Sequence, residues 1–131
     1  MRNRGTLAVV SLDSGADNGQ AYARLFSADG AFVRANGELV TGREALAATA
    51  QRVMKGPLGI SHLIVNHVIE PTADGAIGKQ YVIVIDHHTD GKPSTIFLGG
   101  QYQDEYVKTP QGWRFKTRTE FRSQYTTQAE P

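Results

Sequence analysis

The chain has 131 residues, 40% of them hydrophobic, with no cysteine and a formal net charge of +1 at pH 7. This length suits one domain with its own core. The absence of cysteine excludes disulfides, zinc–thiolate sites and cysteine nucleophiles, and it fits a cytoplasmic protein. Because charges of both signs are mixed and no apolar run approaches the roughly 20 residues of a membrane span, we expect neither nucleic acid nor a membrane as partner.

The first part of the chain is expected to be helical. Residues 6–12 are apolar and predict either the last turns of a helix or a strand, and residues 13–18 predict a turn. Asp17 or Asn18 can cap a following helix that runs through Phe26. A signal peptide is not expected, because the apolar start is short and lacks a convincing cleavage site.

A short strand and a second helix are expected next. The segment 28–30 should end the first helix, residues 31–35 should form a strand, and residues 36–37 a tight turn. The run TGRE that starts at Thr41 matches a capping box, which predicts a helix to about Lys55. Its apolar face is formed by Leu46, Ala50, Val53 and Met54.

The second half of the chain changes to the two-residue alternation that is typical of strands. Four such runs, separated by short turn-forming segments, lie at 61–70, 77–88, 95–107 and 113–122. Short connections favour an antiparallel meander, and helices followed by strands predict an α+β domain with the helices packed on one face of the sheet. The glycine pair at 99–100 predicts a bend or bulge in the third run.

Alternation also assigns the histidines to faces of the sheet. His62 and His67 are expected to point to opposite faces unless a bulge intervenes. His87 and His88 should likewise point apart, so at most one histidine of each strand can reach a shared pocket. The face expected to carry His87 also contains Tyr81, Ile83 and Ile85.

The last strand alternates between apolar and charged side chains. We expect its charged face to meet solvent or a second subunit rather than a substrate. This face is formed by Arg114, Lys116, Arg118, Glu120 and Arg122. Arg34 and Arg118 are candidates for binding an acidic group, although a surface position is preferred for both.

Four stretches carry a resemblance to a known family: YARLFSADGAFV, GELVTGREAL, SHLIVNHVI and GGQYQDEYVKTPQGWRFKTR. In this order they resemble the SnoaL-like group of the nuclear transport factor 2-like superfamily, over about residues 12–122. The resemblance implies one cystatin-like α+β domain over residues 1–131, with a partial first helix at 1–12 and a flexible tail at 123–131. It implies a cone-shaped, curved antiparallel sheet wrapped around N-terminal helices, an apolar pocket, and a homodimer or homotrimer.

Within this group the local match is strongest to scytalone dehydratase-type enzymes. That match places three polar pocket residues on Asp13, His62 and His87. Other pocket positions of those enzymes, including two tyrosines, differ in this chain, where they fall on Leu12, Arg34, Gly100 and Tyr102. The resemblance therefore implies a similar pocket without the same set of groups to polarise a substrate.

If Asp13, His62 and His87 share a pocket, general acid–base catalysis follows, because an imidazole exchanges protons near neutral pH. The first hypothesis is a cofactor-independent lyase or isomerase, dehydratase- or cyclase-like, for a small hydrophobic polyketide-, steroid- or terpenoid-like substrate; which histidine is the base stays open. The expected substrate-binding residues are Tyr81, Tyr102, Ile64, Ile83, Ile85, Leu98, Phe26 and Phe32.

Two other functions compete with this one. The second hypothesis is a non-catalytic binding protein for small molecules, or an accessory subunit of a biosynthetic complex, since the fold builds the same pocket either way. The third is a metal site of two histidines and one carboxylate, which is not favoured because the family works without metal. The structural alternatives are a hydrogen-bonded sheet residue for His62, a solvated strand end for His87 and a turn residue for Asp13.

Overall fold

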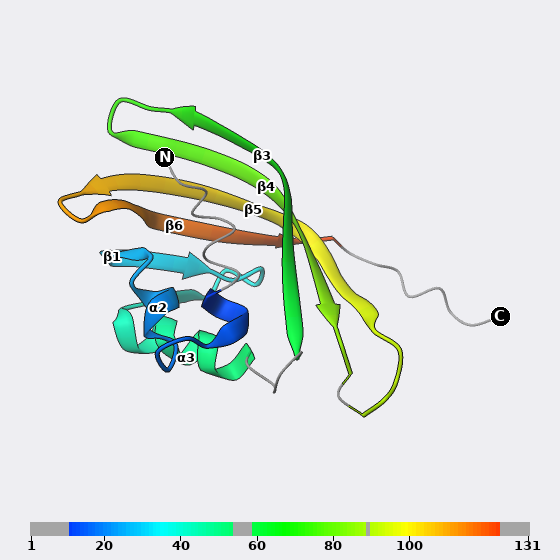
Figure 1. Cartoon of the computed structure of the whole chain (residues 1–131). Helices are drawn as coiled ribbons and strands as arrows, with labels where there is room; N and C mark the ends of the chain where they lie inside the picture. Colours follow the sequence, from blue (N-terminus) through cyan, green and yellow to red (C-terminus); the bar gives the residue numbers. More distant parts are fainter. Residues whose placement is uncertain (1–10, 54–58, 89, 124–131) are drawn as a thin grey trace.

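A computed structural model describes residues 11–53, 59–88 and 90–123. Residues 11–14 are helical. The helices and strands that follow are arranged as helices packed against one sheet (Figure 1). They are α2 Gln20–Ala23, β1 Phe26–Val33, β2 Leu39–Thr41, α3 Arg43–Val53, β3 Ile60–Pro71, β4 Gly75–Asp86, β5 Thr95–Thr109 and β6 Gly112–Arg122. The predicted α+β class is confirmed. In these residues no helix combines the length and apolar character that crossing a membrane requires.

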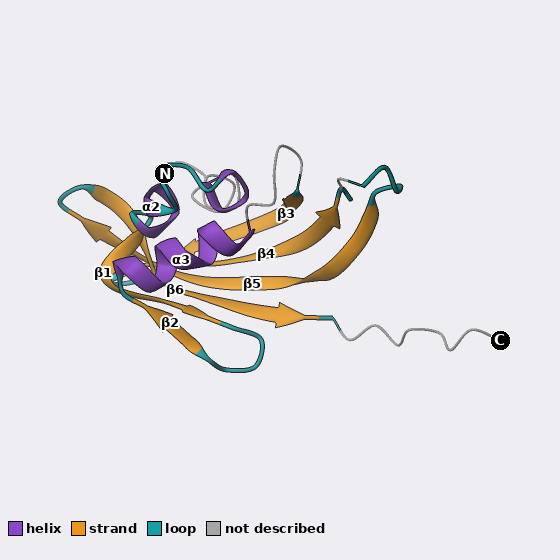
Figure 2. Cartoon of the chain, turned by 90° about the horizontal axis from the view of Figure 1, so that it is seen from below, coloured by secondary structure: helices purple, strands orange, loops and turns teal. Residues whose placement is uncertain are grey.

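Within the described residues the sheet has six strands in the order β2-β1-β6-β5-β4-β3. The predicted meander of the last four strands is confirmed, since β3, β4, β5 and β6 pair antiparallel with their neighbours in sequence. β1, however, pairs parallel with β6, so the sheet is mixed. The sheet curves strongly, and α2 and α3 lie against its inner face (Figures 1 and 2).

The helix predicted to run through Phe26 is shorter than expected. It ends at Ala23, and its N-cap is Gly19 rather than Asp17 or Asn18. Gly19 has a φ of 83°, and a Cβ there would lie 2.1 Å from the backbone oxygen of Ala47, so only glycine allows α2 to approach α3 this closely.

Burial explains why Phe26 joins a strand instead. Phe26 is fully buried, and its ring centroid lies 5.3 Å from those of Tyr22 and Phe115. Phe115 extends this aromatic cluster to Tyr106 at the same spacing. A helix that continued through residues 28–30 would lose these contacts, and the segment is part of β1.

The second predicted helix is present, with a different start. α3 begins at Arg43, one residue after Gly42, whose carbonyl accepts the first helical hydrogen bond. Thr41 belongs to β2 and the residue before the helix is Gly42, which has no side chain, so the predicted capping box of Thr41 and Glu44 is not formed. Leu46 and Ala50 are buried as expected. Met54 and Lys55 lie outside the described residues.

Two bulges change which side chains face the helices. In β3 the register shifts between Val65 and Val68, and Asn66 has a φ of 57°. His62 and His67 therefore point to the same face, contrary to strict alternation. In β6, Lys116 is an extra residue in the pairing with β5. Beyond it the charged residues Arg118, Glu120 and Arg122 face inward instead of toward solvent.

Candidate functional site

Asp13 and His62 form a close pair between the N-terminal helix and β3. The Oδ1 atom of Asp13 lies 2.5 Å from Nδ1 of His62, and its Oδ2 atom accepts the backbone N–H of His62 at 2.7 Å. Both side chains are mostly buried, 18% and 11% exposed respectively. The two contacts fix the ring and place the imidazole proton on Nδ1. This leaves Nε2 of His62 for another partner.

His62 lines a cavity of about 170 Å³ beneath the helices. Its apolar wall comes from the N-terminal helix, α3 and four strands, and consists of Leu12, Phe32, Val53, Ile60, Val84 and Leu98. Its polar lining consists of Tyr22, Arg34, Thr49, His62, Tyr102, Glu120 and Arg122. An apolar chamber with a few polar groups is the usual form of a small-molecule site.

Tyr22 and Tyr102 supply hydroxyl groups to this cavity. Burial raises the pKa of both phenols, although the nearby Arg118 guanidinium opposes the shift. Both hydroxyls are therefore protonated at neutral pH. Neither hydroxyl hydrogen-bonds to another side chain within residues 11–53, 59–88 and 90–123. Each is a free donor for an oxygen atom of a bound molecule.

A second polar cluster lies beneath Tyr102 and is closed. Arg118 is 1% exposed and donates through Nε and a terminal nitrogen to the two carboxylate oxygens of Asp104, at 2.9 and 3.0 Å. Gln80 and the Tyr106 hydroxyl also donate to Asp104. The Arg118 guanidinium lies 4.3 Å from the ring centroid of Tyr102. Burial opposes the charge of Arg118, but Asp104 outweighs it and raises the pKa of the guanidinium.

Five of the residues predicted for the site are brought together. Asp13 contacts His62, and Phe32, Leu98 and Tyr102 line the same cavity as His62. Phe26 and Ile64 do not line it. Phe26 belongs to the aromatic core, and Ile64 packs against the core from β3.

The predicted position of His87 needs correction. Its Nε2 lies 2.7 Å from Oγ of Ser61, and its Nδ1 lies 3.4 Å from Oγ of Ser94. Ser61 precedes His62 in β3, so their side chains point to opposite faces. His87 therefore lies on the outer face, away from Asp13 and His62.

The register of β3 with β4 gives the physical reason. His62 pairs with Val84, so the inward side chains of β4 are Val84, Val82 and Gln80. The neighbouring residues on the outer face include Tyr81, which is 51% exposed, together with Ile83 and Ile85. Three of the predicted substrate-binding residues are thus on the wrong side of the sheet.

The candidate metal set of Asp13, His62 and His87 is not assembled, because His87 is on the other face. No group of three or more metal-binding side chains occurs in the part of the chain that the structure describes.

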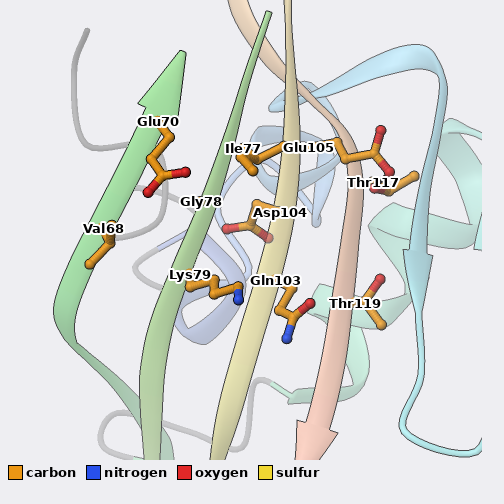
Figure 3. Close-up of a pocket in the computed structure, with 10 residues that line it drawn as sticks. All are labelled: Val68, Glu70, Ile77, Gly78, Lys79, Gln103, Asp104, Glu105, Thr117 and Thr119. Carbon is orange, nitrogen blue, oxygen red and sulfur yellow. Dashed lines mark hydrogen bonds between the residues drawn. The ribbon is translucent and has the colours of Figure 1, made fainter. Parts of the chain in front are cut away.

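The outer face carries a separate hollow of about 290 Å³ (Figure 3). Its lining comes from β3 to β6: Val68, Glu70, Ile77, Gly78, Lys79, Gln103, Asp104, Glu105, Thr117 and Thr119. The charged side chains drawn there lie on neighbouring strands. This hollow has no paired acid and base comparable to Asp13 and His62.

Five polar residues of the inner cavity were not among the predicted site residues: Tyr22, Arg34, Thr49, Glu120 and Arg122. Strict alternation placed Glu120 and Arg122 on the solvent face, and the bulge at Lys116 reverses that assignment. Arg34 was a candidate for binding an acidic group, but a surface position was preferred for it, although it follows Phe32 by two residues and shares its side of the strand. Tyr22 carried no signal that distinguishes a core tyrosine from a cavity donor.

Comparison with known proteins identifies the family and the fold. The model of the SnoaL-like domain family matches residues 6–119, whereas no curated protein matches the chain. A "Putative Scytalone Dehydratase" from Novosphingobium aromaticivorans is 28% identical with a TM-score of 0.76, over 92% of this chain and 80% of that one.

Two further solved structures share the fold. An NTF2-like protein with a cystatin-like fold, also from Novosphingobium aromaticivorans, is 21% identical with a TM-score of 0.80, over 96% of this chain and 81% of that one. ActVI-ORFA from Streptomyces coelicolor is 18% identical with a TM-score of 0.76, over 92% of both chains.

Proposed function

Because the chain belongs to the family of SnoaL-like domains, we propose that it is a cofactor-independent lyase or isomerase for a small hydrophobic substrate of polyketide, steroid or terpenoid type. The observation that supports this most directly is the Asp13–His62 pair at an apolar cavity. The likeness to the Novosphingobium aromaticivorans protein described as a scytalone dehydratase supports the same reaction class.

In the proposed reaction His62 is the general base. Its Nε2 removes a proton from the carbon next to a carbonyl, and the electrons of the broken C–H bond move onto the carbonyl oxygen as an enolate. Asp13 holds the ring and stabilises the imidazolium that forms. Tyr22 or Tyr102 donates a hydrogen bond to the charged oxygen. The proton then returns to another carbon in an isomerisation, or leaves with a hydroxyl group as water in a dehydration.

The first half of this reaction can be measured without the natural substrate. We expect the protein to accelerate exchange of the α-protons of 2-tetralone for deuterium in D₂O, followed by NMR. His62→Gln should lower the catalysed rate by about 10²–10⁴-fold, the usual contribution of one general base. His87→Gln is the matched control, because His87 lies on the outer face, and it should retain the rate. Undiminished exchange in His62→Gln would refute the mechanism.

A second candidate function is binding without catalysis, as a small-molecule carrier or accessory subunit. The composition of the pocket supports it, because two positions that carry tyrosines in scytalone dehydratase-type enzymes fall on Leu12 and Arg34 in this chain. Saturable binding of 2-tetralone with no exchange above the buffer rate would support this function over the first.

We also propose that the protein is a homodimer or homotrimer that associates through the outer face of the sheet. Large apolar side chains are exposed there, including Leu63, Val68, Ile77, Tyr81 and Phe121. Lys79 on β4 and Glu105 on the neighbouring β5 line the same hollow (Figure 3). In a symmetric pair, Lys79 of one copy can therefore meet Glu105 of the other. Light scattering should give a multiple of the 14.3 kDa chain mass, and Tyr81→Glu should shift the protein toward monomer.

A further inference from the structure

We propose that the cavity binds a molecule with a carboxylate group, and that Arg34 is the residue that recognises it. This inference rests on the proposed function only in that both use the same cavity. It adds an acidic group to the substrate, at a position separate from the Asp13–His62 pair. The reacting carbon would lie near β3, and the carboxylate near the end of β1.

The side chain of Arg34 lines the cavity but lacks a strong partner. Its Nε atom is buried and makes no hydrogen bond within the described residues. The nearest carboxylate oxygen, Oε2 of Glu38, is 3.8 Å away, beyond hydrogen-bond distance, and the Glu38 side chain is 62% exposed. A buried donor without an acceptor is costly. An acceptor on a bound molecule would remove that cost.

Among the arginines that line the cavity, Arg34 is the one without a hydrogen-bonded carboxylate in the described residues. Glu120 is the carboxylate on the adjacent strand that lines the same cavity, and Arg122 donates to it. Arg122 is therefore engaged by Glu120, whereas Arg34 has only the exposed Glu38 within 4 Å among the described residues and makes no hydrogen bond to it. A guanidinium binds a carboxylate with two parallel hydrogen bonds, so an arginine suits this ligand group better than a lysine would.

The remaining neighbours can contribute to the same group. Phe32 lies two residues before Arg34, and its ring packs against Tyr102 with centroids 6.4 Å apart. The hydroxyls of Tyr22 and Tyr102 stay protonated, so they donate to an oxygen rather than repel it. Arg118 does not serve as the recognising cation, because it is 1% exposed, donates to both oxygens of Asp104 and is not among the residues that line the cavity.

The test compares two aromatic probes of equal shape, 2-naphthoate and its neutral amide 2-naphthamide, by calorimetry or NMR titration. We expect the wild-type protein to bind the naphthoate at least tenfold more tightly. Arg34→Gln should abolish this preference, and Arg34→Lys should keep part of it. Arg24→Gln is the control, since Arg24 pairs with Asp17 at 2.8 Å outside the cavity lining, and it should retain the full preference.

Two results would overturn the inference: equal binding of both probes by the wild-type protein, or an unchanged preference in Arg34→Gln. If Arg34→Gln does not fold, Glu120→Gln replaces it. Removing that carboxylate should strengthen naphthoate binding, and weaker binding would count against the inference. The same titrations in His62→Gln separate catalysis by His62 from carboxylate recognition by Arg34. This variant should lose the proton exchange but keep the preference for naphthoate.

Discussion

Two carboxylates pair with nitrogen groups under the same sheet, and their surroundings differ. Asp104 and Arg118 are 2% and 1% exposed, and the partners of Asp104 come from the core itself. Asp13 and His62 are less buried, and His62 lines a cavity. The Asp104–Arg118 pair is satisfied within the core and holds the fold together, although Oε1 of the neighbouring Gln80 has no partner among the described residues. The Asp13–His62 pair instead lies beside a cavity, where a bound molecule could reach it.

The strongest test of this contrast is to break the closed cluster. Asp104→Asn should lower the free energy of unfolding by about 3–5 kcal/mol, because it leaves the Arg118 cation buried without a countercharge. Urea unfolding measures the change. Replacing the pair together, with leucine for Asp104 and methionine for Arg118, should cost less than the single change. Glu105→Gln, on the outer face, is the control. If Asp104→Asn lowers the free energy of unfolding no more than this control does, Asp104 is not part of a structural cluster.

Hydroxyl deletions sharpen the comparison, because they remove the same atom from each cluster. Tyr106→Phe removes a donor that lies 3.1 Å from the Asp104 carboxylate, and should cost about 1.5–3 kcal/mol of stability. Tyr102→Phe removes a hydroxyl with no partner in the described part of the chain, so it should change stability by less than about 0.5 kcal/mol. Equal losses in the two variants would show that the hydroxyl of Tyr102 is not free.

Asp13→Asn should have a moderate effect on stability. The carboxylate accepts the backbone N–H and faces the ring of His62, and an asparagine keeps one acceptor oxygen. We expect a loss of about 1 kcal/mol, together with loss of the proton exchange described above. A stability loss as large as that of Asp104→Asn would instead place Asp13 among the residues that hold the fold.

The smallest expected effect concerns His67, which lies on the inner face after the bulge in β3. Burial lowers its pKa, and Arg118 lowers it further, while Asp104 opposes the shift. Its stabilising contribution is therefore complete above about pH 6.5, the ordinary value, and declines as the pH falls below it. His67→Gln should flatten the dependence of melting temperature on pH between about pH 5 and 7. An unchanged slope would mean that His67 accepts a proton freely in the folded protein.

The sequence was sufficient for the parts of the fold that depend on local pattern. The four long strands, their order and α3 were predictable from alternation, turn residues and helical spacing. β1 was not predicted in full, because its start at Phe26 depends on contact with Phe115, which is distant in sequence. Tertiary burial outweighed helical spacing at that residue.

For the site, the sequence supplied residues but not the faces on which they lie. Asp13 and His62 were placed together by resemblance, and the structure brings them into contact. His87 was assigned to the same cavity by resemblance as well, but His62 pairs with Val84, which leaves His87 on the other face. Arg118 and Glu120 were assigned outward because a single extra residue at Lys116 leaves no mark in the alternation.

The parallel pairing of β1 with β6 joins an early segment of the chain to the last strand of the sheet. During synthesis on the ribosome, Phe26 and Tyr22 have no Phe115 to pack against until nearly the whole domain has emerged. Contacts this remote in sequence slow folding and leave apolar surface uncovered for longer. A truncation that removes β6 should therefore yield an aggregating chain rather than a smaller folded domain.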